Sequence, residues 1–187
     1  MPADNHALKV TENPLSGVLV LEPRVFADAR GFFLESYNER NMAAIGIHSH
    51  FVQDNHSYSR RNVVRGLHYQ VNSSQGKLVR VVTGEIFDVV VDLRRSSPTF
   101  GKWFGLRLSA ENKRMLWVPS GFAHGFHVLS DNADVLYKAT DFYAPEFERT
   151  IVWDDPDLAI EWNLNEPPIV SEKDGKGVQF KDAETFA

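Results

Sequence analysis

The chain has no cysteine, no long apolar run and no excess of basic residues. Without cysteine, disulfide bonds and thiol chemistry are excluded. No stretch approaches the roughly 20 apolar residues of a membrane-spanning helix. The first residues lack the basic and apolar regions of a secretory signal, so a cytoplasmic protein is expected. A formal charge of −5 gives no general attraction to nucleic acid or an anionic membrane, so an anionic small substrate would need locally placed Arg and Lys side chains.

The composition is that of one soluble globular domain. At 187 residues the chain is long enough for one substantial core and short for two domains. Hydrophobic residues make up 43% and charged residues 24%, which is ordinary for a folded protein. After Trp162 the sequence shows little hydrophobic periodicity, which is typical of a loosely held terminus.

Short apolar bursts separated by turn residues predict a mainly β protein, a sandwich or barrel with few short helices. The bursts cover residues 18–21, 32–37, 78–82, 86–93, 104–108 and 135–137. Thr83-Gly84-Glu85 predicts a hairpin turn between two of them, and residues 95–98 predict a loop. One helix is predicted over residues 38–46, with Asn38 as its N-cap and Gly46 at its end.

Two histidines and a tyrosine on predicted strands provide the acid–base groups that a proton-transfer site needs. His68 lies in Gly-Leu-His-Tyr-Gln, where strand alternation puts it on one face with Gly66 and Gln70. His124 follows the turn Pro-Ser-Gly, and Tyr137 lies in Leu-Tyr-Lys with its side chain opposite Lys138. Taken alone, a histidine or a tyrosine on a strand more often has a structural role. Together, with no nucleophile or phosphate-binding glycine loop, they favour moving protons on carbon.

Polar residues at inward strand positions predict a polar cavity. Gln53 and Asn55 share one strand face, where unpaired amides would be costly in a dry core. Arg65 and Lys77 flank the histidine strand and would supply positive charge.

Metal binding is the alternative use of the seven histidines. His48 and His50 have the spacing of ligands on one strand face, and His124 with His127 could add others. Against this, no second histidine or glutamate accompanies His68.

Several motifs in chain order resemble the RmlC family, the dTDP-4-dehydrorhamnose 3,5-epimerases. They occupy residues 26–35, 53–57, 65–70, 75–80, 97–101, 119–126, 136–140, 151–156 and 171–174. The resemblance implies a cupin-type jelly roll, a homodimer, and inversion of carbons 3 and 5 of dTDP-4-dehydro-6-deoxy-D-glucose. It implies no metal and no redox cofactor. A single domain over residues 1–187 is expected, with residues 1–15 as an N-terminal extension and 163–187 as a tail that contributes to the site.

The resemblance also implies roles for four residues. His68 would be the proton acceptor and Tyr137 the proton donor from the opposite ring face. Asp174 would pair with the histidine, and Lys77 would stabilise the enolate oxygen. Substrate-binding roles are implied for Arg30, Glu35, Gln53, Asn55, Arg65, His124, Glu148 and Lys173. Arg30 and Glu35 are expected to serve the neighbouring subunit's site.

Several questions stay open at this level. His127 stands where many family members carry an aliphatic residue, and strand parity predicts that it faces away from the ligand. A 3-epimerase or 5-epimerase acting on a related 4-keto sugar would carry nearly the same residues. A metal-dependent cupin enzyme and a non-catalytic sugar-nucleotide binding module are the competing classes.

Overall fold

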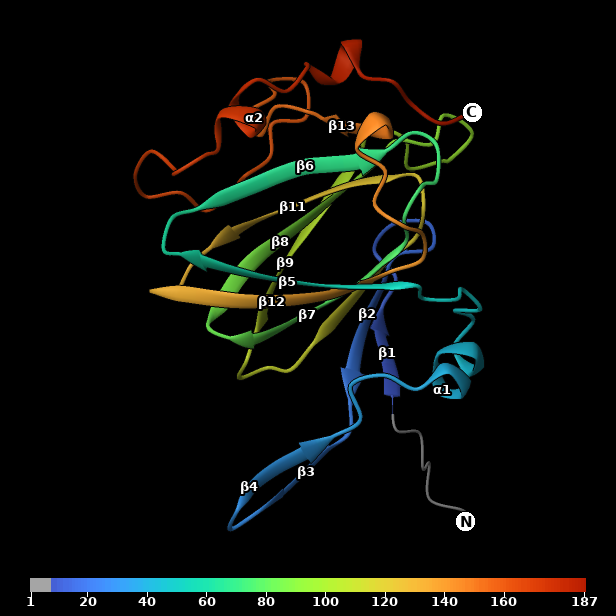
Figure 1. The fold of residues 1–187 in the computed structure, drawn as a ribbon, viewed down its shortest axis with the longest axis vertical. Coiled ribbons are helices and arrows are strands. Elements are labelled where there is room, and N and C mark those ends of the chain that lie inside the picture. Colours follow the sequence, from blue (N-terminus) through green and yellow to red (C-terminus); the bar gives the residue numbers. More distant parts are fainter. Residues whose placement is uncertain (1–7) are drawn as a thin grey trace.

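In the computed structural model, which describes residues 8–187, two antiparallel sheets pack face to face in a jelly-roll sandwich (Figure 1). One sheet has the strand order β1-β2-β10-β7-β12-β5, and the other has the order β13-β6-β11-β8-β9. The strands are β1 (Leu8–Glu12), β2 (Leu19–Pro23), β3 (Val25–Asp28), β4 (Gly31–Leu34), β5 (Gln53–Arg60), β6 (Val64–Gln70), β7 (Lys77–Thr83), β8 (Glu85–Asp92), β9 (Trp103–Ser109), β10 (Met115–Val118), β11 (Phe122–Val128), β12 (Asn132–Ala139) and β13 (Glu148–Thr150). The predicted mainly β class is confirmed.

Apolar side chains from both sheets fill the space between them. Val79 and Val135 come from the six-stranded sheet, while Ile86, Val90 and Leu108 come from the five-stranded sheet. All five are essentially inaccessible to solvent. This core fills one part of the space between the sheets, and polar side chains line the other part.

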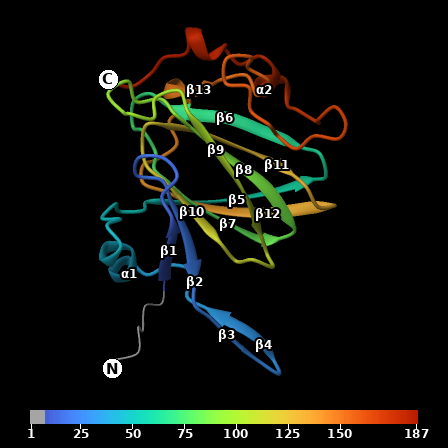
Figure 2. The same ribbon diagram turned by 180° about the vertical axis from the view of Figure 1, so that it is seen from behind.

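The five-stranded sheet is covered on both faces, which explains why β8 is apolar almost throughout. Its outer face packs against the C-terminal segment, including Leu158, Trp162 and Ala183. Figures 1 and 2 show this segment, in orange and red, lying over the β6 side of the sandwich. It includes helix α2 (Glu172–Gly175) and the 3-10 turn Phe180–Asp182. The low periodicity of this segment predicted a loosely held tail, and that prediction is wrong. Apolar contacts and β-bridges hold the segment against the sheet.

The predicted helix is α1 (Glu39–Ala44), and its predicted cap is confirmed. The Asn38 side chain accepts hydrogen bonds from the Arg40 and Asn41 backbone N–H groups. Gly46 follows at φ +89, a backbone conformation that glycine adopts readily. Among residues 8–187, no helix has the length and apolar character needed to cross a bilayer.

The predicted hairpin at Thr83-Gly84-Glu85 is wrong. The turn joins β7 to β8, which lie in different sheets, so the chain crosses from one layer to the other there. Sequence adjacency suggested pairing, whereas in the sandwich β7 pairs with β10 and β12. The apolar segment at residues 32–37 also differs, since within residues 8–187 β4 pairs with β3 alone, in a two-stranded ribbon that projects from the sandwich (Figure 1).

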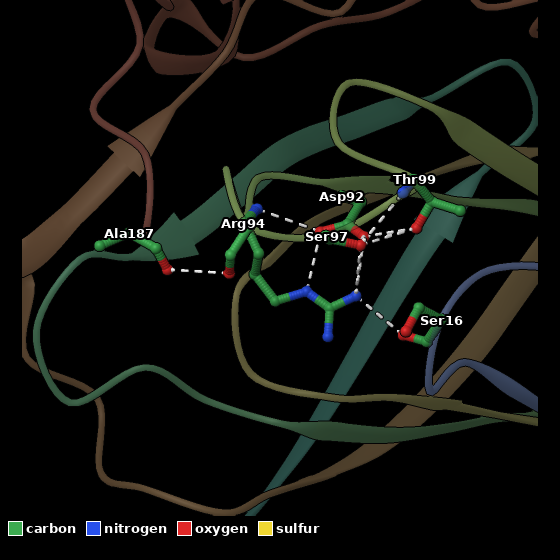
Figure 3. Close-up of polar contacts among 7 residues, drawn as sticks. Ser16, Asp92, Arg94, Ser97, Thr99 and Ala187 are labelled. Atoms are coloured by element: carbon green, nitrogen blue, oxygen red, sulfur yellow. Dashed lines mark hydrogen bonds and ion pairs between the residues drawn. The ribbon is translucent and has the colours of Figure 1, made fainter.

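A buried carboxylate organises the predicted loop at residues 95–98 (Figure 3). Asp92 accepts hydrogen bonds from Arg94, Ser97 and Thr99. Burial opposes its ionisation, but these bonds prevail and lower the pKa of Asp92 to about 2. The same loop receives the chain's end, because the Arg95 N–H donates to the Phe186 carbonyl.

Gly66 on β6 allows two strands to approach closely. It has φ +113, and a Cβ there would lie 2.6 Å from the Gly125 Cα and 2.7 Å from the His124 carbonyl oxygen. We expect Gly66→Ala to destabilise the fold by roughly 2–6 kcal/mol, the sum of backbone strain and overpacking. Urea unfolding measures this. The control Gly175→Ala, with no heavy atom within 4 Å of the added Cβ, should keep its midpoint. Equal midpoints for both variants would contradict this account.

Candidate active site

A polar cavity of about 240 Å³ lies between the two sheets. Both sheets contribute to its wall, together with the loops that carry Gln75 and Tyr143. The site residues predicted from the sequence that line it are Arg65, His68, Lys77, His124, Tyr137 and Glu148. The structure therefore brings together side chains from strands that are far apart in sequence.

His68 pairs with Asp174, as predicted. Its Nε2–H donates to Asp174 Oδ1 over 2.6 Å, and the Gly66 N–H donates to Asp174 Oδ2 over 3.2 Å. Burial opposes ionisation of Asp174, but the bond from His68 and its charge prevail, so the pKa of Asp174 is lowered. A carboxylate that only accepts fixes the proton on Nε2. Nδ1 of His68, with no hydrogen-bond partner among residues 8–187, is left to accept a proton.

Tyr137 faces the cavity from the other sheet. It lies on β12 in the six-stranded sheet, whereas His68 lies on β6 in the five-stranded sheet. As strand alternation predicted, Lys138 points the other way and pairs with Asp54. Burial raises the pKa of Tyr137; Arg65 opposes this rise and Glu148 adds to it. The phenol therefore keeps its proton at neutral pH and is available as an acid.

Lys77 is a buried cation that no acidic group holds by a direct contact. Among residues 8–187 its ammonium has no hydrogen bond or ion pair, although the side chain is only 9% exposed and lines the cavity. Burial lowers the pKa of Lys77 to about 8, against the opposing charges of Asp88 and Glu148. An ammonium in this position is suited to stabilise a developing negative charge inside the cavity.

His124 is also paired with a carboxylate. Its Nε2 lies 2.9 and 3.0 Å from the two oxygens of Asp88, which is fully buried on β8. The register pairs His124 with His68 across β11 and β6. Two imidazoles therefore lie on neighbouring strands of one wall, each with its own carboxylate.

Charged groups also gather where the C-terminal segment meets the cavity. Lys173 forms an ion pair with Glu148 at 2.5 Å, and the Tyr143 hydroxyl donates to the same carboxylate over 2.9 Å. Arg65 lines the cavity while its guanidinium donates to the Ser59 hydroxyl. The predicted binding residues Arg65, Glu148 and Lys173 thus surround one region.

The remaining predicted residues divide into two groups. The Gln53 amide donates to Asn55 and accepts from the N–H of Tyr143, which lines the cavity, so the two predicted amides reach the cavity only through this loop. Arg30 does not reach the cavity of its own chain: it is exposed on the ribbon and paired with Asp28. Glu35 is also outside, where it accepts hydrogen bonds from the side chains of Asn38 and Asn41.

His127 faces away from the cavity, as predicted. It is buried on the opposite face of β11, with Nδ1 2.8 Å from the Trp162 carbonyl oxygen and Nε2 3.2 Å from Asn62 Oδ1. It therefore does not converge with His68 and His124, as the metal alternative required. Within the described residues 8–187, no three His, Asp or Glu side chains are grouped to hold a metal ion.

Among the residues that were not predicted from the sequence, Asp88 and Tyr143 contact predicted site residues directly, at His124 and Glu148. Asp88 is a lone acid inside the apolar stretch of β8, and that interruption was a signal that could have identified it. Tyr143 lies in a loop after Phe142, and no periodicity marked it as a cavity residue.

The fold and the cavity define a cupin-type protein with paired acid–base groups, and comparison with known proteins gives the family. The family model for dTDP-4-dehydrorhamnose 3,5-epimerase matches residues 12–182. A dTDP-4-dehydrorhamnose 3,5-epimerase of Pseudomonas aeruginosa is 61% identical over 180 residues, covering 96% of this chain and 99% of that protein.

Solved structures agree. A Legionella pneumophila RmlC, in complex with dTDP-4-keto-L-rhamnose, superposes with a TM-score of 0.91 at 48% identity, covering 95% of each chain. ChmJ of Streptomyces bikiniensis, a 3'-monoepimerase in complex with dTDP-quinovose, gives a TM-score of 0.82 at 32% identity, covering 89% of this chain and 85% of that one. The chain belongs to the dTDP-4-dehydrorhamnose 3,5-epimerase family.

Proposed function

We propose that this protein inverts carbons 3 and 5 of dTDP-4-dehydro-6-deoxy-D-glucose, giving dTDP-4-dehydro-L-rhamnose in deoxysugar biosynthesis. The observation that carries the proposal is the placement of His68 and Tyr137 on opposite walls of one cavity. A base and an acid on opposite faces of a sugar ring are what an inversion requires.

The chemistry follows from the position of the keto group. Carbons 3 and 5 both flank carbon 4, so loss of either proton gives an enolate whose charge spreads to the carbonyl oxygen. Nδ1 of His68 takes the proton from one face, and the ammonium of Lys77 stabilises the enolate oxygen. Tyr137 then returns a proton to the opposite face, and exchange with solvent restores both residues before the second inversion.

The charged rim of the cavity supports recognition of a nucleotide sugar. Arg65 can donate in parallel to pyrophosphate oxygens. Glu148 and Lys173, with Gln53 and Asn55, provide donors and acceptors for the sugar and the base. We include in the proposal that residues 163–187 complete the site through Asp174, which the hydrogen bond to His68 supports.

The relatives support inversion of both carbons over inversion of one. The similar proteins named as 3,5-epimerases are 61% and 48% identical to this chain, whereas the monoepimerase is 32% identical. The test is incubation with dTDP-4-dehydro-6-deoxy-D-glucose and NMR of the product, whose ring-proton couplings report both configurations. Inversion of carbon 3 alone would replace the proposal with a 3-epimerase, and binding without conversion would replace it with a binding module.

A homodimer belongs to the same proposal, with Arg30 and Glu35 serving the partner's cavity. The β3–β4 ribbon supports this, because it projects from the sandwich (Figure 2). Its Phe32 and Phe33 side chains are 59% and 68% exposed. We place the enzyme in the cytoplasm, where the nucleoside triphosphates used to make nucleotide sugars are held.

Mixing two inactive variants tests the shared site. If Arg30 acts in trans, a heterodimer of Arg30→Ala and His68→Ala has one intact site. Random reassortment into a symmetric dimer should then restore about one quarter of wild-type activity. Each variant alone should stay low. A monomer in sedimentation, or no recovery after subunit exchange is verified, would contradict this arrangement.

A further inference from the structure

Asp88 is a fully buried carboxylate beside the cavity with no step of its own in the proposed reaction. On β8 it shares a face with Ile86 and Val90, which belong to the apolar core between the sheets. An ionised carboxylate among apolar side chains is costly unless it is paired. The groups that pair with the Asp88 carboxylate therefore determine its role in the site.

The direct partner of Asp88 is His124. Both carboxylate oxygens lie within 3.0 Å of His124 Nε2, and within residues 8–187 no other hydrogen bond to the Asp88 carboxylate is present. The carboxylate only accepts, so Nε2 must carry the proton. Nδ1 of His124, which has no partner within the same residues, is then the ring nitrogen available to a ligand.

The second partner acts through its charge. Burial lowers the pKa of Lys77 to about 8, and the negative charge of Asp88 is the largest influence that opposes this, ahead of Glu148. The ionisable groups around the cavity with Lys77 are Asp88 (β8), Glu148 (β13), His124 (β11), Tyr137 (β12), His68, Arg65 and Tyr69 (β6), and Tyr143. Of the two acids among them, Glu148 already pairs with Lys173, while within residues 8–187 no Lys or Arg side chain contacts the Asp88 carboxylate.

We propose that Asp88 is a positioning residue of this site, whose buried carboxylate orients the His124 ring and keeps Lys77 protonated where an enolate oxygen would develop. The proposal rests on the proposed epimerase function for its kinetic consequence. Its electrostatic consequence is independent of any substrate.

The pH profile of kcat provides the kinetic test. In the wild type, kcat should fall as pH rises through about 8, because Lys77 loses its proton. The raised pKa of Tyr137 keeps that phenol from causing a fall in this range. In Asp88→Asn the fall should move to lower pH by about one unit or more, the usual effect of removing a nearby opposite charge. At pH 8 the variant should be about fivefold slower than the wild type or more, with a smaller deficit at pH 6.

Asp92→Asn is the matched control, since Asp92 is an equally buried acid on the same strand whose side-chain partners are Arg94, Ser97 and Thr99. It should alter stability and leave the alkaline fall in place. An unshifted fall in Asp88→Asn, or an equal shift in Asp92→Asn, would overturn the proposal.

Measurements without substrate separate this proposal from the proposed function. Carbon-13 NMR of labelled lysine should show Lys77 titrating at lower pH in Asp88→Asn than in the wild type. If it does while the wild type fails to convert the sugar, the epimerase assignment fails and the role of Asp88 toward Lys77 stands. If Asp88→Asn does not fold, nitrogen-15 NMR of wild-type histidines still decides: His124 must carry its proton on Nε2 at pH 7, and an unprotonated Nε2 contradicts the proposal.

Discussion

His68→Ala is expected to lower the rate of ring-proton exchange into the 4-keto sugar by about 10²–10⁴-fold. Residues 8–187 offer no replacement base at that position. The second imidazole, His124, has its Nε2 committed to Asp88, and Lys77 is protonated below about pH 8. Deuterium incorporation from heavy water, followed by NMR, measures the effect.

Two controls separate a lost base from a damaged fold. His56→Ala removes an exposed histidine on β5 that pairs with Asp134, and it should exchange at the wild-type rate. His68→Ala itself should keep near-normal affinity for thymidine diphosphate, because the proposed nucleotide contacts come from other residues. Exchange by His68→Ala at the wild-type rate would refute its role as base.

Tyr137→Phe should have a different signature. With His68 and Lys77 in place, the enolate can still form, and the proton can return from the histidine face. We expect deuterium at carbon 3 with retained configuration, while inverted product falls by about 10²-fold or more. NMR of the recovered sugar distinguishes labelled substrate from inverted product.

Tyr58→Phe is the matched control for the phenol. Tyr58 lies on the same sheet with its side chain exposed, so its variant should form product normally. Inverted product from Tyr137→Phe at the wild-type rate would show that the donor is another group.

Strand alternation predicted more of the site than of the topology. It put His68 on a face apart from Leu67 and Tyr69, and both of these pack on the outer side of the sheet. It also put Lys138 opposite Tyr137. The alternation of side chains is a property of a single strand, so it does not depend on which strands pair with each other.

Features that depend on distant contacts could not be obtained from local patterns. The Gly84 turn looks like a hairpin, and only the sandwich determines that β7 and β8 lie in different sheets. The C-terminal segment lacks periodicity because it packs as irregular chain, and the resemblance rather than the pattern indicated that Asp174 meets His68. The acid of Asp88 interrupts an apolar stretch and is visible in the sequence, but its partner His124 lies 36 residues away on another strand and is not.

The most direct test of the central claim is a wild-type reaction in heavy water with dTDP-4-dehydro-6-deoxy-D-glucose. Because each inversion removes a carbon-bound proton on one face and returns a solvent-derived proton on the other, deuterium should appear at both carbon 3 and carbon 5 of the inverted product. Deuterium at carbon 3 alone would contradict a 3,5-epimerase. No deuterium at either carbon would contradict acid–base catalysis by His68 and Tyr137.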